Sequence, residues 1–423
     1  MAVSLREDPA TAVDANALTG RAPIAAARRD RHAPRQDGDR RVVSVGAGVT
    51  KSKETAQKVQ VTIIGAGVVG CALAYEFSLR AIDVLVLEGE SRIADGTTSR
   101  NSGVVHAGLY YPPGSLKAES CVRGSRLLYE WCAQRGVAHR KTGKWIVGSK
   151  DEESELADLL QNGLTCGAIG VAWGDPAGLK AELPGVRAEI GLFSAETGIV
   201  DPYEYARSLQ IAAEQNGALV LTDARVHGLV ALAGGGYRLE TTRGAVDAEL
   251  VINAAGLFAD DVARLAGVDK YRIHPCRGDY FRLRDARRYE SLVYPVKKRG
   301  SAGLGVHLTL GLDGSYRLGP DVEWVTSKTD YAPPAKVQTK LEAFCAAAGA
   351  YLEGIGVEQL SYDSCGLRPK LRSPTDSEER DFVISEDAPG LVNLVGIESP
   401  GLTAARDLAQ RVVNRLVGAL PPG

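Results

Sequence analysis

The sequence has few of the features that tie a chain to a metal, a disulfide framework or a membrane. Its seven cysteines are an odd number and no two form a C-x-x-C pair, so we expect reduced thiols and no metal site. The most apolar window, residues 61–75, is shorter than the roughly 20 residues that span a bilayer, which leaves only a peripheral membrane contact open. A formal net charge of −2 gives no indication of nucleic-acid binding.

The chain of 423 residues is too long for one ordinary hydrophobic core, so two domains are expected. Residues 1–58 show little hydrophobic periodicity and are rich in Ala, Arg, Asp and Pro, which predicts a disordered tail. The arginines also allow a mitochondrial transit peptide, although acidic residues such as Glu7 and Asp8 are unusual in one. We expect a protein that is cytoplasmic or peripheral at the inner membrane in a bacterium, and mitochondrial in a eukaryote.

A Gly-Ala-Gly triplet follows a β-branched run twice, in VVSVGAGVT (42–50) and in VTIIGAGVVG (61–70). The first copy has Lys51 where a dinucleotide-binding turn needs its third glycine. Its connection to the next strand is also shorter than the dozen or so residues that a crossover helix needs. The first copy is therefore interpreted as tail sequence that resembles the motif only in composition.

The second copy has every part of a dinucleotide-binding unit. Residues 59–64 predict a buried strand, Gly65, Gly67 and Gly70 have the G-x-G-x-x-G spacing, and a mostly apolar helix start follows. Residues 83–88 predict a second strand that ends at Glu88, whose carboxylate can accept hydrogen bonds from ribose hydroxyls. The helix N-terminus supplies amide donors to the phosphates. This unit binds the ADP half of either NAD or FAD.

Three later segments favour a flavin. Residues 97–111 form a polar run rich in Ser, Thr and Asn, which suits a ligand that extends past its first pyrophosphate contacts. Residues 248–256 predict a strand that ends in small residues, where the backbone could pass close to a cofactor. Residues 391–403 predict a strand and a turn before a helix over 404–417, whose N-terminal dipole could face the pyrimidine edge of a flavin.

These segments resemble the FAD-dependent L-2-hydroxyglutarate dehydrogenase and oxidase family, within the broader D-amino-acid-oxidase-like flavoproteins. The resemblance runs from about residue 59 to the C-terminus and is carried by VTIIGAGVVG, TTSRNSGVVHAGLYYPPGSLKAESCVRG, TGIVDPYEYA, VINAAGLFAD, LGVHLTL, LGPDVEWV, GLRPKL and GLVNLVGIESPGLT. It implies hydride transfer from C2 of L-2-hydroxyglutarate to N5 of a non-covalent FAD, which gives 2-oxoglutarate.

The implied fold is α/β, with a Rossmann-like FAD-binding βαβ domain and a substrate domain built on a mainly antiparallel sheet. We expect residues 59–110, 195–265 and 360–423 in the FAD-binding domain and residues 111–194 and 266–359 in the substrate domain. The residues expected to contact FAD are Gly65, Gly67, Gly70, Glu88, Thr98, Ser99, Asn101, Ser102, Val226, Ala255, Gly256, Gly396, Gly401, Leu402 and Thr403.

Oxidation of a 2-hydroxy acid needs a clamp for the carboxylate and a base for the hydroxyl proton. Arg368, in a G-x-R-P context that binds the substrate acid in related flavoproteins, is the predicted clamp. His106 is the predicted base, because an imidazole accepts a proton near neutral pH, and its alternative role is only to pack against or hydrogen-bond the flavin. His307 is the rival base and His274 a weaker third. Lys370 and Arg277 are the two predictions for the anchor of a second carboxylate, and an ordinary salt bridge is the alternative role for each. Tyr110 and Tyr280 are expected to line the substrate pocket.

Other functions remain open from the residues alone. The same fold could act on another 2-hydroxy acid, an amino acid or glycerol 3-phosphate, because Arg368 suits any carboxylate. A flavin-binding subunit without catalysis and a NAD-dependent enzyme are further alternatives. The sequence does not choose among oxygen, a quinone and an electron-transfer flavoprotein as the electron acceptor.

Overall fold

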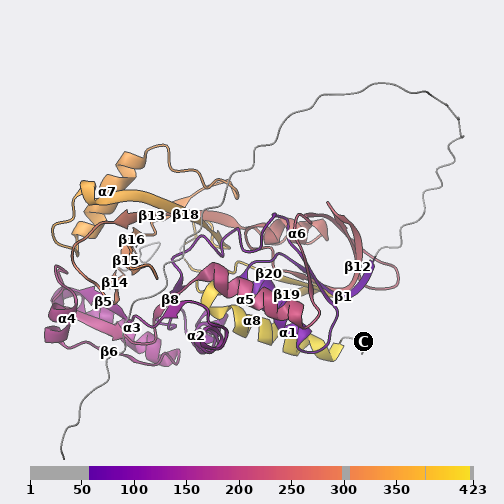
Figure 1. The fold of residues 1–423 in the computed structure, drawn as a ribbon, viewed down its shortest axis with the longest axis horizontal. Helices are drawn as coiled ribbons and strands as arrows, with labels where there is room; N and C mark the ends of the chain where they lie inside the picture. The colour runs from indigo at the N-terminus through magenta and orange to yellow at the C-terminus, as the bar shows by residue number, and fades with distance from the viewer. Residues whose placement is uncertain (1–56, 298–304, 377, 420–423) are drawn as a thin grey trace, which may run out of the picture. The chain divides into compact units, whose positions relative to one another are not determined.

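The computed structural model describes residues 57–297, 305–376 and 378–419, and Figure 1 shows how their helices and strands are arranged. The predicted tail, up to residue 56, and the first Gly-Ala-Gly copy lie outside these residues. Residues 57 and 58 belong to the first strand, so the tail prediction extends two residues too far.

A largely parallel sheet carries the glycine-rich turn. Strand β1 (Gln57–Ile64) lies between β12 (Gly244–Asn253) and β2 (Val84–Leu87), and β9 (Leu219–Leu221) extends the sheet beyond β2, all in parallel. Helix α1 (Val68–Ser78) connects β1 to β2, as the sequence predicts. Because both faces are covered, β2 consists of four buried aliphatic residues instead of alternating polar and apolar ones.

Antiparallel strands complete this sheet at its other edge. The N-terminal half of β12 pairs with β11 (Tyr237–Thr241), which pairs with β10 (Val226–Ala231). The C-terminal end of β12 pairs in parallel with β20 (Leu391–Val395), which pairs with β19 (Val383–Ala388). The C-terminal part of the chain thus joins the same sheet as the glycine-rich turn.

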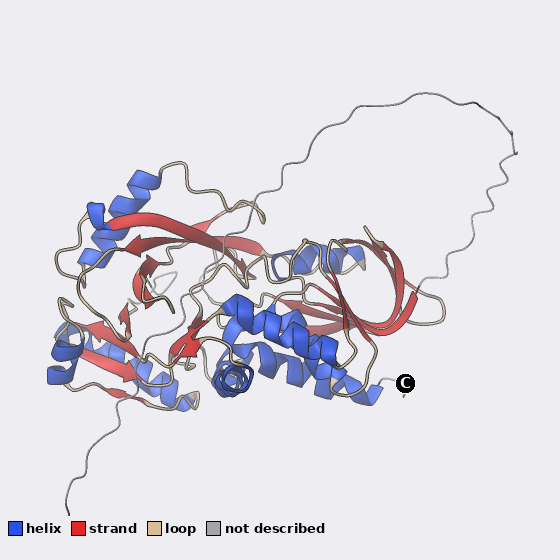
Figure 2. Ribbon diagram, in the orientation of Figure 1, coloured by secondary structure: helices blue, strands red, loops and turns tan. Residues whose placement is uncertain are grey.

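A layer of helices packs against one face of the parallel sheet (Figure 2). It contains α1, α2 (Leu116–Arg135), α5 (Pro202–Gln215) and α8 (Gly401–Leu416). The sequence analysis assigns α2 to the substrate domain, but Leu128 and Trp131 of α2 share one apolar core with Leu73 of α1. A Cβ at Gly124 of α2 would overlap the Thr403 carbonyl, so the absence of a side chain at Gly124 lets α2 pack closely on α8.

A second sheet is antiparallel except for one parallel pair, β14 with β5. Its strand order is β17 (Glu323–Trp324), β13 (His274–Leu283), β16 (Tyr316–Gly319), β15 (His307–Leu310), β14 (Leu292–Pro295), β5 (Lys144–Gly148), β7 (Ile190–Ser194) and β6 (Val171–Trp173). Strand β18 (Leu360–Lys370) pairs with β13 along its length. The prediction that places residues 360–370 in the FAD-binding domain is therefore corrected, because their hydrogen-bonding partner is β13.

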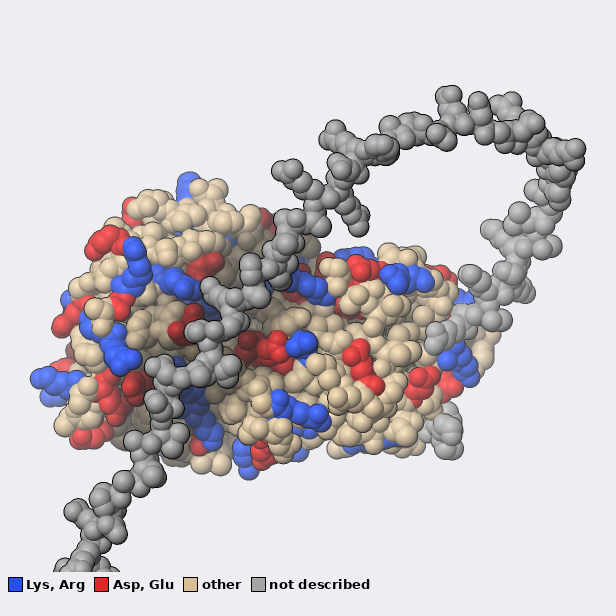
Figure 3. Space-filling model, viewed as in Figure 1, with Lys and Arg blue, Asp and Glu red and all other residues tan. Residues whose placement is uncertain are grey.

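Shorter elements surround these two sheets. They are α3 (Glu153–Thr165), α4 (Pro176–Glu182), α6 (Ala259–Leu265), α7 (Val337–Gly349), the 3-10 turns η1 (Lys150–Glu152), η2 (Gly256–Phe258), η3 (Val357–Gln359) and η4 (Val417–Ala419), and a small sheet of β3 (Val104–Val105), β8 (Gly198–Val200) and β4 (His139–Arg140). Basic and acidic side chains are interspersed on the face shown in Figure 3. Within the described residues, none of the helices combines the length and the apolar character that crossing a membrane requires.

Candidate active site

A continuous cavity of about 930 Å³ extends from the glycine-rich turn to His106, His307 and Arg368. Its walls come from the carboxyl ends of β1, β2 and β12, from the loop after β2, from β18, and from the turn before α8. Ligands of open α/β sheets bind at the carboxyl ends of the strands. The cavity therefore connects the predicted nucleotide site with the predicted reaction site.

The glycine-rich turn is shaped by close backbone contacts. Gly65 has φ of +103°, and a Cβ there would lie 2.7 Å from the Ala254 carbonyl oxygen. A Cβ at Gly70 would overlap the Gly65 carbonyl, so this glycine acts in the packing of α1 on β1 and does not itself line the cavity. The Glu88 carboxylate, at the end of β2, accepts a hydrogen bond of 2.8 Å from Ala66 N–H.

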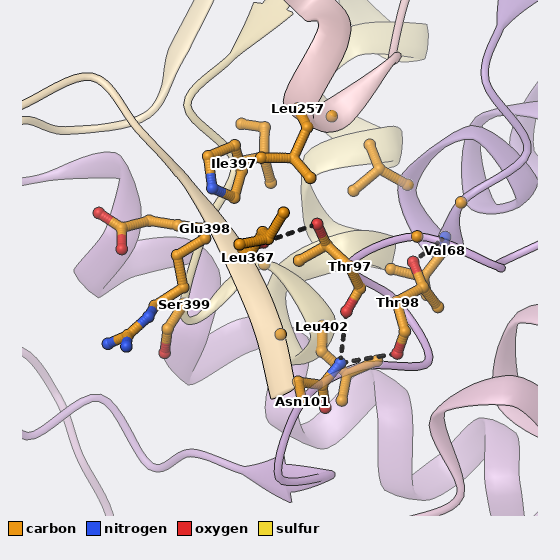
Figure 4. Close-up of a pocket in the computed structure, with 18 of the residues that line it drawn as sticks. Val68, Thr97, Thr98, Asn101, Leu257, Leu367, Ile397, Glu398, Ser399 and Leu402 are labelled. Atoms are coloured by element: carbon orange, nitrogen blue, oxygen red, sulfur yellow. Dashed lines mark hydrogen bonds between the residues drawn. The ribbon is translucent and has the colours of Figure 1, made fainter. Parts of the chain in front are cut away.

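The loop over residues 97–102 is held in place by its own side chains and by β18. Asn101 Nδ2 donates to the carbonyls of Thr97 (3.0 Å) and Thr98 (2.6 Å), and Thr98 Oγ1 accepts from Val68 N–H at the start of α1 (Figure 4). Thr97 Oγ1 donates to the Leu367 carbonyl at 3.0 Å. This loop thereby joins the two sheets along one wall of the cavity.

The structure brings most predicted cofactor residues to the cavity, but not all of them. Those that line it are Gly65, Gly67, Glu88, Thr98, Asn101, Ser102, Val226, Ala255, Gly256, Gly401 and Leu402. Gly70, Ser99, Gly396 and Thr403 are not among the lining residues. Gly396 has φ of +73° and turns the chain after β20, and Thr403 is fully buried in the first turn of α8.

His106 lies at the far end of the cavity from the glycine-rich turn. Its Nε2 is 3.4 Å from Ser399 Oγ, which in turn is 3.4 Å from the Tyr111 hydroxyl. Its Nδ1 makes no hydrogen bond to any of the described residues. Burial, together with the charge of Lys144, lowers the pKa of His106 to about 3. The imidazole is therefore neutral near pH 7 and keeps a nitrogen lone pair, although the lowered pKa makes it a weaker base than a free imidazole.

His307, the rival base, is more enclosed. Its ring stacks on Tyr294 with 3.7 Å between the ring centroids, and its Nδ1 lies 3.0 Å from the Gly305 carbonyl. A carbonyl oxygen only accepts, so Nδ1 carries the proton and Nε2 is the free acceptor. Burial lowers the pKa of His307 to about 3. His274, the third candidate, does not line the cavity.

Arg368, on β18, reaches the cavity beside the buried Tyr280. Its Nη2 donates to the carbonyl oxygens of Arg277 (3.1 Å) and Asp321. Among the described residues, no carboxylate forms an ion pair with it. The guanidinium is thus oriented by backbone oxygens while its positive charge stays uncompensated, as a carboxylate clamp requires.

The two predicted anchors for a second carboxylate are occupied by protein carboxylates. Lys370 lines the cavity, but its Nζ lies 3.0 Å from Glu398 and 3.2 Å from Glu379. Arg277 does not line the cavity and forms a buried ion pair of 2.7 Å with Asp279. The structure therefore places the backbone of Arg277 beside Arg368 but keeps its side chain out of the cavity, and it gives Lys370 another partner.

Several residues of this site were not singled out by the sequence analysis. Ser399 and Tyr294 line the cavity, and Lys144 lies behind Tyr110 and Tyr294. The one local signal for Lys144 is a lysine that opens the apolar run KWIV, which becomes the fully buried strand β5. Pairing of this strand with β14 brings it to the site.

Similar proteins share most of the chain. The mitochondrial L-2-hydroxyglutarate dehydrogenase of Arabidopsis thaliana is 36% identical over 88% of this chain and 86% of its own length. The mitochondrial enzyme of the same name from Homo sapiens is 35% identical over 68% of this chain and 65% of its own length. A glycerol 3-phosphate dehydrogenase of Caloramator mitchellensis is 29% identical over 84% of this chain.

The fold is also shared with solved structures. A dithionite-reduced L-α-glycerophosphate oxidase from Mycoplasma pneumoniae with FAD bound superimposes with a TM-score of 0.78 and 26% identity, covering 87% of this chain and 97% of that one. Glycine oxidase from Geobacillus kaustophilus gives a TM-score of 0.70 at 19% identity, covering 87% and 96%, which shows a common fold. Both support an α/β fold with a mixed nucleotide-binding sheet and a mainly antiparallel second sheet.

The cavity fits FAD. A Cβ at Gly67 would lie 3.2 Å from Thr98 Oγ1, a tight contact, and the absence of a side chain there lets a phosphate approach the backbone. Gly401 and Leu402, at the start of α8, line the same cavity, where the helix dipole favours negative charge. Residues 60–415 match the family described as FAD dependent oxidoreductase, abbreviated DAO. This chain therefore belongs to the DAO family of FAD-dependent oxidoreductases.

Proposed function

We propose that this protein oxidises L-2-hydroxyglutarate to 2-oxoglutarate. The proposal is carried by the presence of Arg368 and His106 in the same cavity. Arg368 forms no ion pair with a carboxylate among the described residues, and His106 is neutral. A cation for the acid group and an acceptor for the hydroxyl proton are what a 2-hydroxy acid needs. The substrate itself is inferred from the names of relatives at about a third identity.

Each residue has a distinct task in this proposal. Arg368 holds the carboxylate next to the reacting carbon, since its planar fork can donate two parallel hydrogen bonds. His106 accepts the hydroxyl proton, with Ser399 positioning Nε2; His307 is the alternative acceptor. A bound FAD would supply the hydride acceptor for C2. Glu88, Thr98 and the glycine-rich turn, which line the same cavity, would hold its ADP half.

The cofactor is proposed to be bound without a covalent link. Among the described residues, no cysteine side chain lines the cavity. Cys365, which precedes the Arg368 motif, is buried with its Sγ 3.5 Å from the Tyr331 carbonyl. A thiol in such a position has no access to a ligand in the cavity.

An anaerobic titration tests the proposal. The purified yellow protein is mixed with L-2-hydroxyglutarate, and bleaching of the flavin absorbance is followed by stopped-flow spectroscopy. We expect rapid bleaching by the L-enantiomer and none by the D-enantiomer. Glycerol 3-phosphate and L-amino acids are the competing substrates, because relatives and structural neighbours bear those names. Faster bleaching by either of these would replace the proposed substrate.

A further inference from the structure

A buried lysine with no acidic partner lies behind the reaction site. Lys144 opens strand β5 and is 1% exposed. Its Nζ lies 4.6 Å from the ring centroid of Tyr110 and 4.8 Å from that of Tyr294, and both tyrosines line the cavity. Within the part of the chain that the structure describes, Lys144 Nζ makes neither an ion pair nor a hydrogen bond.

This arrangement is costly for folding. A buried ammonium group normally has a carboxylate partner, and contacts with aromatic rings replace only part of the lost hydration. The contrast within the same site is direct: Lys117 and Lys370 are also buried, and both pair with Glu398. A buried lysine without a carboxylate partner, directly behind two tyrosines that line the cavity, points to a negatively charged ligand on the other side of those tyrosines.

Arg368 and Lys144 both lie close to His307. The charges of both lie close enough to His307 to lower its pKa, and neither meets a carboxylate among the described residues. The hydroxyl groups of Tyr110 and Tyr294 likewise make no hydrogen bond to another described residue. Two tyrosine hydroxyls and one buried cation are therefore free to stabilise an anionic group next to the Arg368 clamp.

We propose that Lys144 supplies the second positive charge that makes the site select a dicarboxylate. Arg368 binds the carboxylate beside the oxidised carbon, and Tyr110 and Tyr294 bind the distal carboxylate under the influence of Lys144. Lys144 does not line the cavity, so it is a positioning residue that acts through the two tyrosines. The inference rests on the proposed function and names Lys144 in the role that the sequence analysis gives to Lys370 or Arg277.

The protonation state of Lys144 should make dicarboxylate affinity depend on pH. Burial lowers the pKa of Lys144 to about 7, and the groups that act on it or respond to it are Cys121, Tyr110, Tyr294, His106 and His307. The neighbouring strand β7 carries no titratable side chain. A bound anion favours the charged lysine, so dicarboxylate affinity should fall as the pH rises through about 7.

The test compares binding of glutarate and pentanoate, which have the same chain length and differ in one carboxylate. Affinities are measured by titration calorimetry on the FAD-loaded wild type and on Lys144→Met. We expect Lys144→Met to bind glutarate about tenfold or more weakly and pentanoate as well as the wild type does. Equal losses for both ligands, or no loss for either, would overturn the inference.

Lys141→Met is the matched control. Lys141 lies on the same stretch of chain but is exposed, and it pairs with Glu196 at 2.6 Å. Its loss removes one positive charge without touching the tyrosines of the cavity, so both affinities should stay unchanged. If Lys144→Met does not fold, the wild type alone decides: glutarate affinity must fall above pH 7 while pentanoate affinity stays flat. A flat profile for glutarate would reject the role of Lys144.

The proposed function fails separately. If L-2-hydroxyglutarate does not bleach the flavin of the wild type, the proposed substrate is wrong, whatever affinities Lys144→Met shows. If L-2-hydroxyglutarate bleaches the wild type but Lys144→Met keeps the full preference for glutarate over pentanoate, the proposed substrate stands. Only the role assigned to Lys144 is then rejected.

Discussion

Thr403 Oγ1 accepts a hydrogen bond from the backbone N–H of His106 at 3.1 Å. This contact attaches the loop that carries His106 to the first turn of α8. Thr403 is fully buried, so the bond has no competition from water. The position of the proposed base is thus set by a residue that does not line the cavity.

Replacement of Thr403 by valine should therefore affect both stability and catalysis. The change leaves the partly buried N–H of His106 without its acceptor, which costs about 1–3 kcal/mol of unfolding free energy. We expect a lower melting temperature and a lower kcat with FAD still bound. Thr403→Ser keeps the hydroxyl group and should behave like the wild type. A Thr403→Val variant with wild-type kcat would show that this bond does not position His106.

Replacement of Arg368 by alanine should weaken the use of any carboxylate substrate. Loss of a bidentate, charge-assisted contact should reduce kcat/KM by about 100-fold or more. Arg368→Lys keeps the charge but not the planar fork, and we expect an intermediate value. Steady-state kinetics with L-2-hydroxyglutarate measures both variants. Similar kcat/KM values for Arg368→Ala and the wild type would remove Arg368 from the clamp.

The two histidines can be separated by reductive half-reactions. His106→Asn should slow anaerobic flavin reduction by about 10²-fold or more, since a positioned base contributes that much. His307→Asn is the matched variant, and it should reduce the flavin at a rate within about tenfold of the wild type if His106 is the acceptor. The reverse order of rates would assign the proton to His307.

The buried histidines also predict a pH dependence of stability. Burial lowers the pKa of His106 and of His307 to about 3, whereas an unfolded histidine titrates near 6.5. Between these values the unfolded chain binds more protons, so the free energy of unfolding should fall as the pH is lowered from about 6.5. Urea unfolding at pH 7 and pH 5 measures the difference, which should shrink in His307→Phe. An unchanged difference would mean that His307 does not contribute.

Local sequence was sufficient for the parts of the site that depend on local geometry. The strand before Gly65, the helix that follows, and Glu88 at the end of β2 form one continuous unit, so spacing along the chain predicts it. The strand, turn and helix near the C-terminus were predicted for the same reason, although α8 begins at Gly401 and not at residue 404.

Contacts between distant segments were not predictable in this way. The periodicity of α2 predicts a helix, but only its packing on α8 decides which sheet it covers. Lys370 and Arg277 have the right charge for an anchor, yet Glu398 and Asp279 neutralise them through contacts that the sequence does not reveal. Lys144 was missed for the converse reason, since a buried cation without a partner is visible only in three dimensions.

The hydrogen bond between Thr97 and the Leu367 carbonyl joins residues 270 positions apart. The nucleotide-binding turn is thus among the first described segments to leave the ribosome, while Arg368, β20 and the start of α8 are among the last. A nascent chain can form the turn early, but the parts of the cavity wall that β18 and the start of α8 supply are added only after residue 401 has been translated. We therefore expect FAD to be retained only after these segments have been synthesised, and a chain truncated before β18 to bind FAD more weakly than the chain described here.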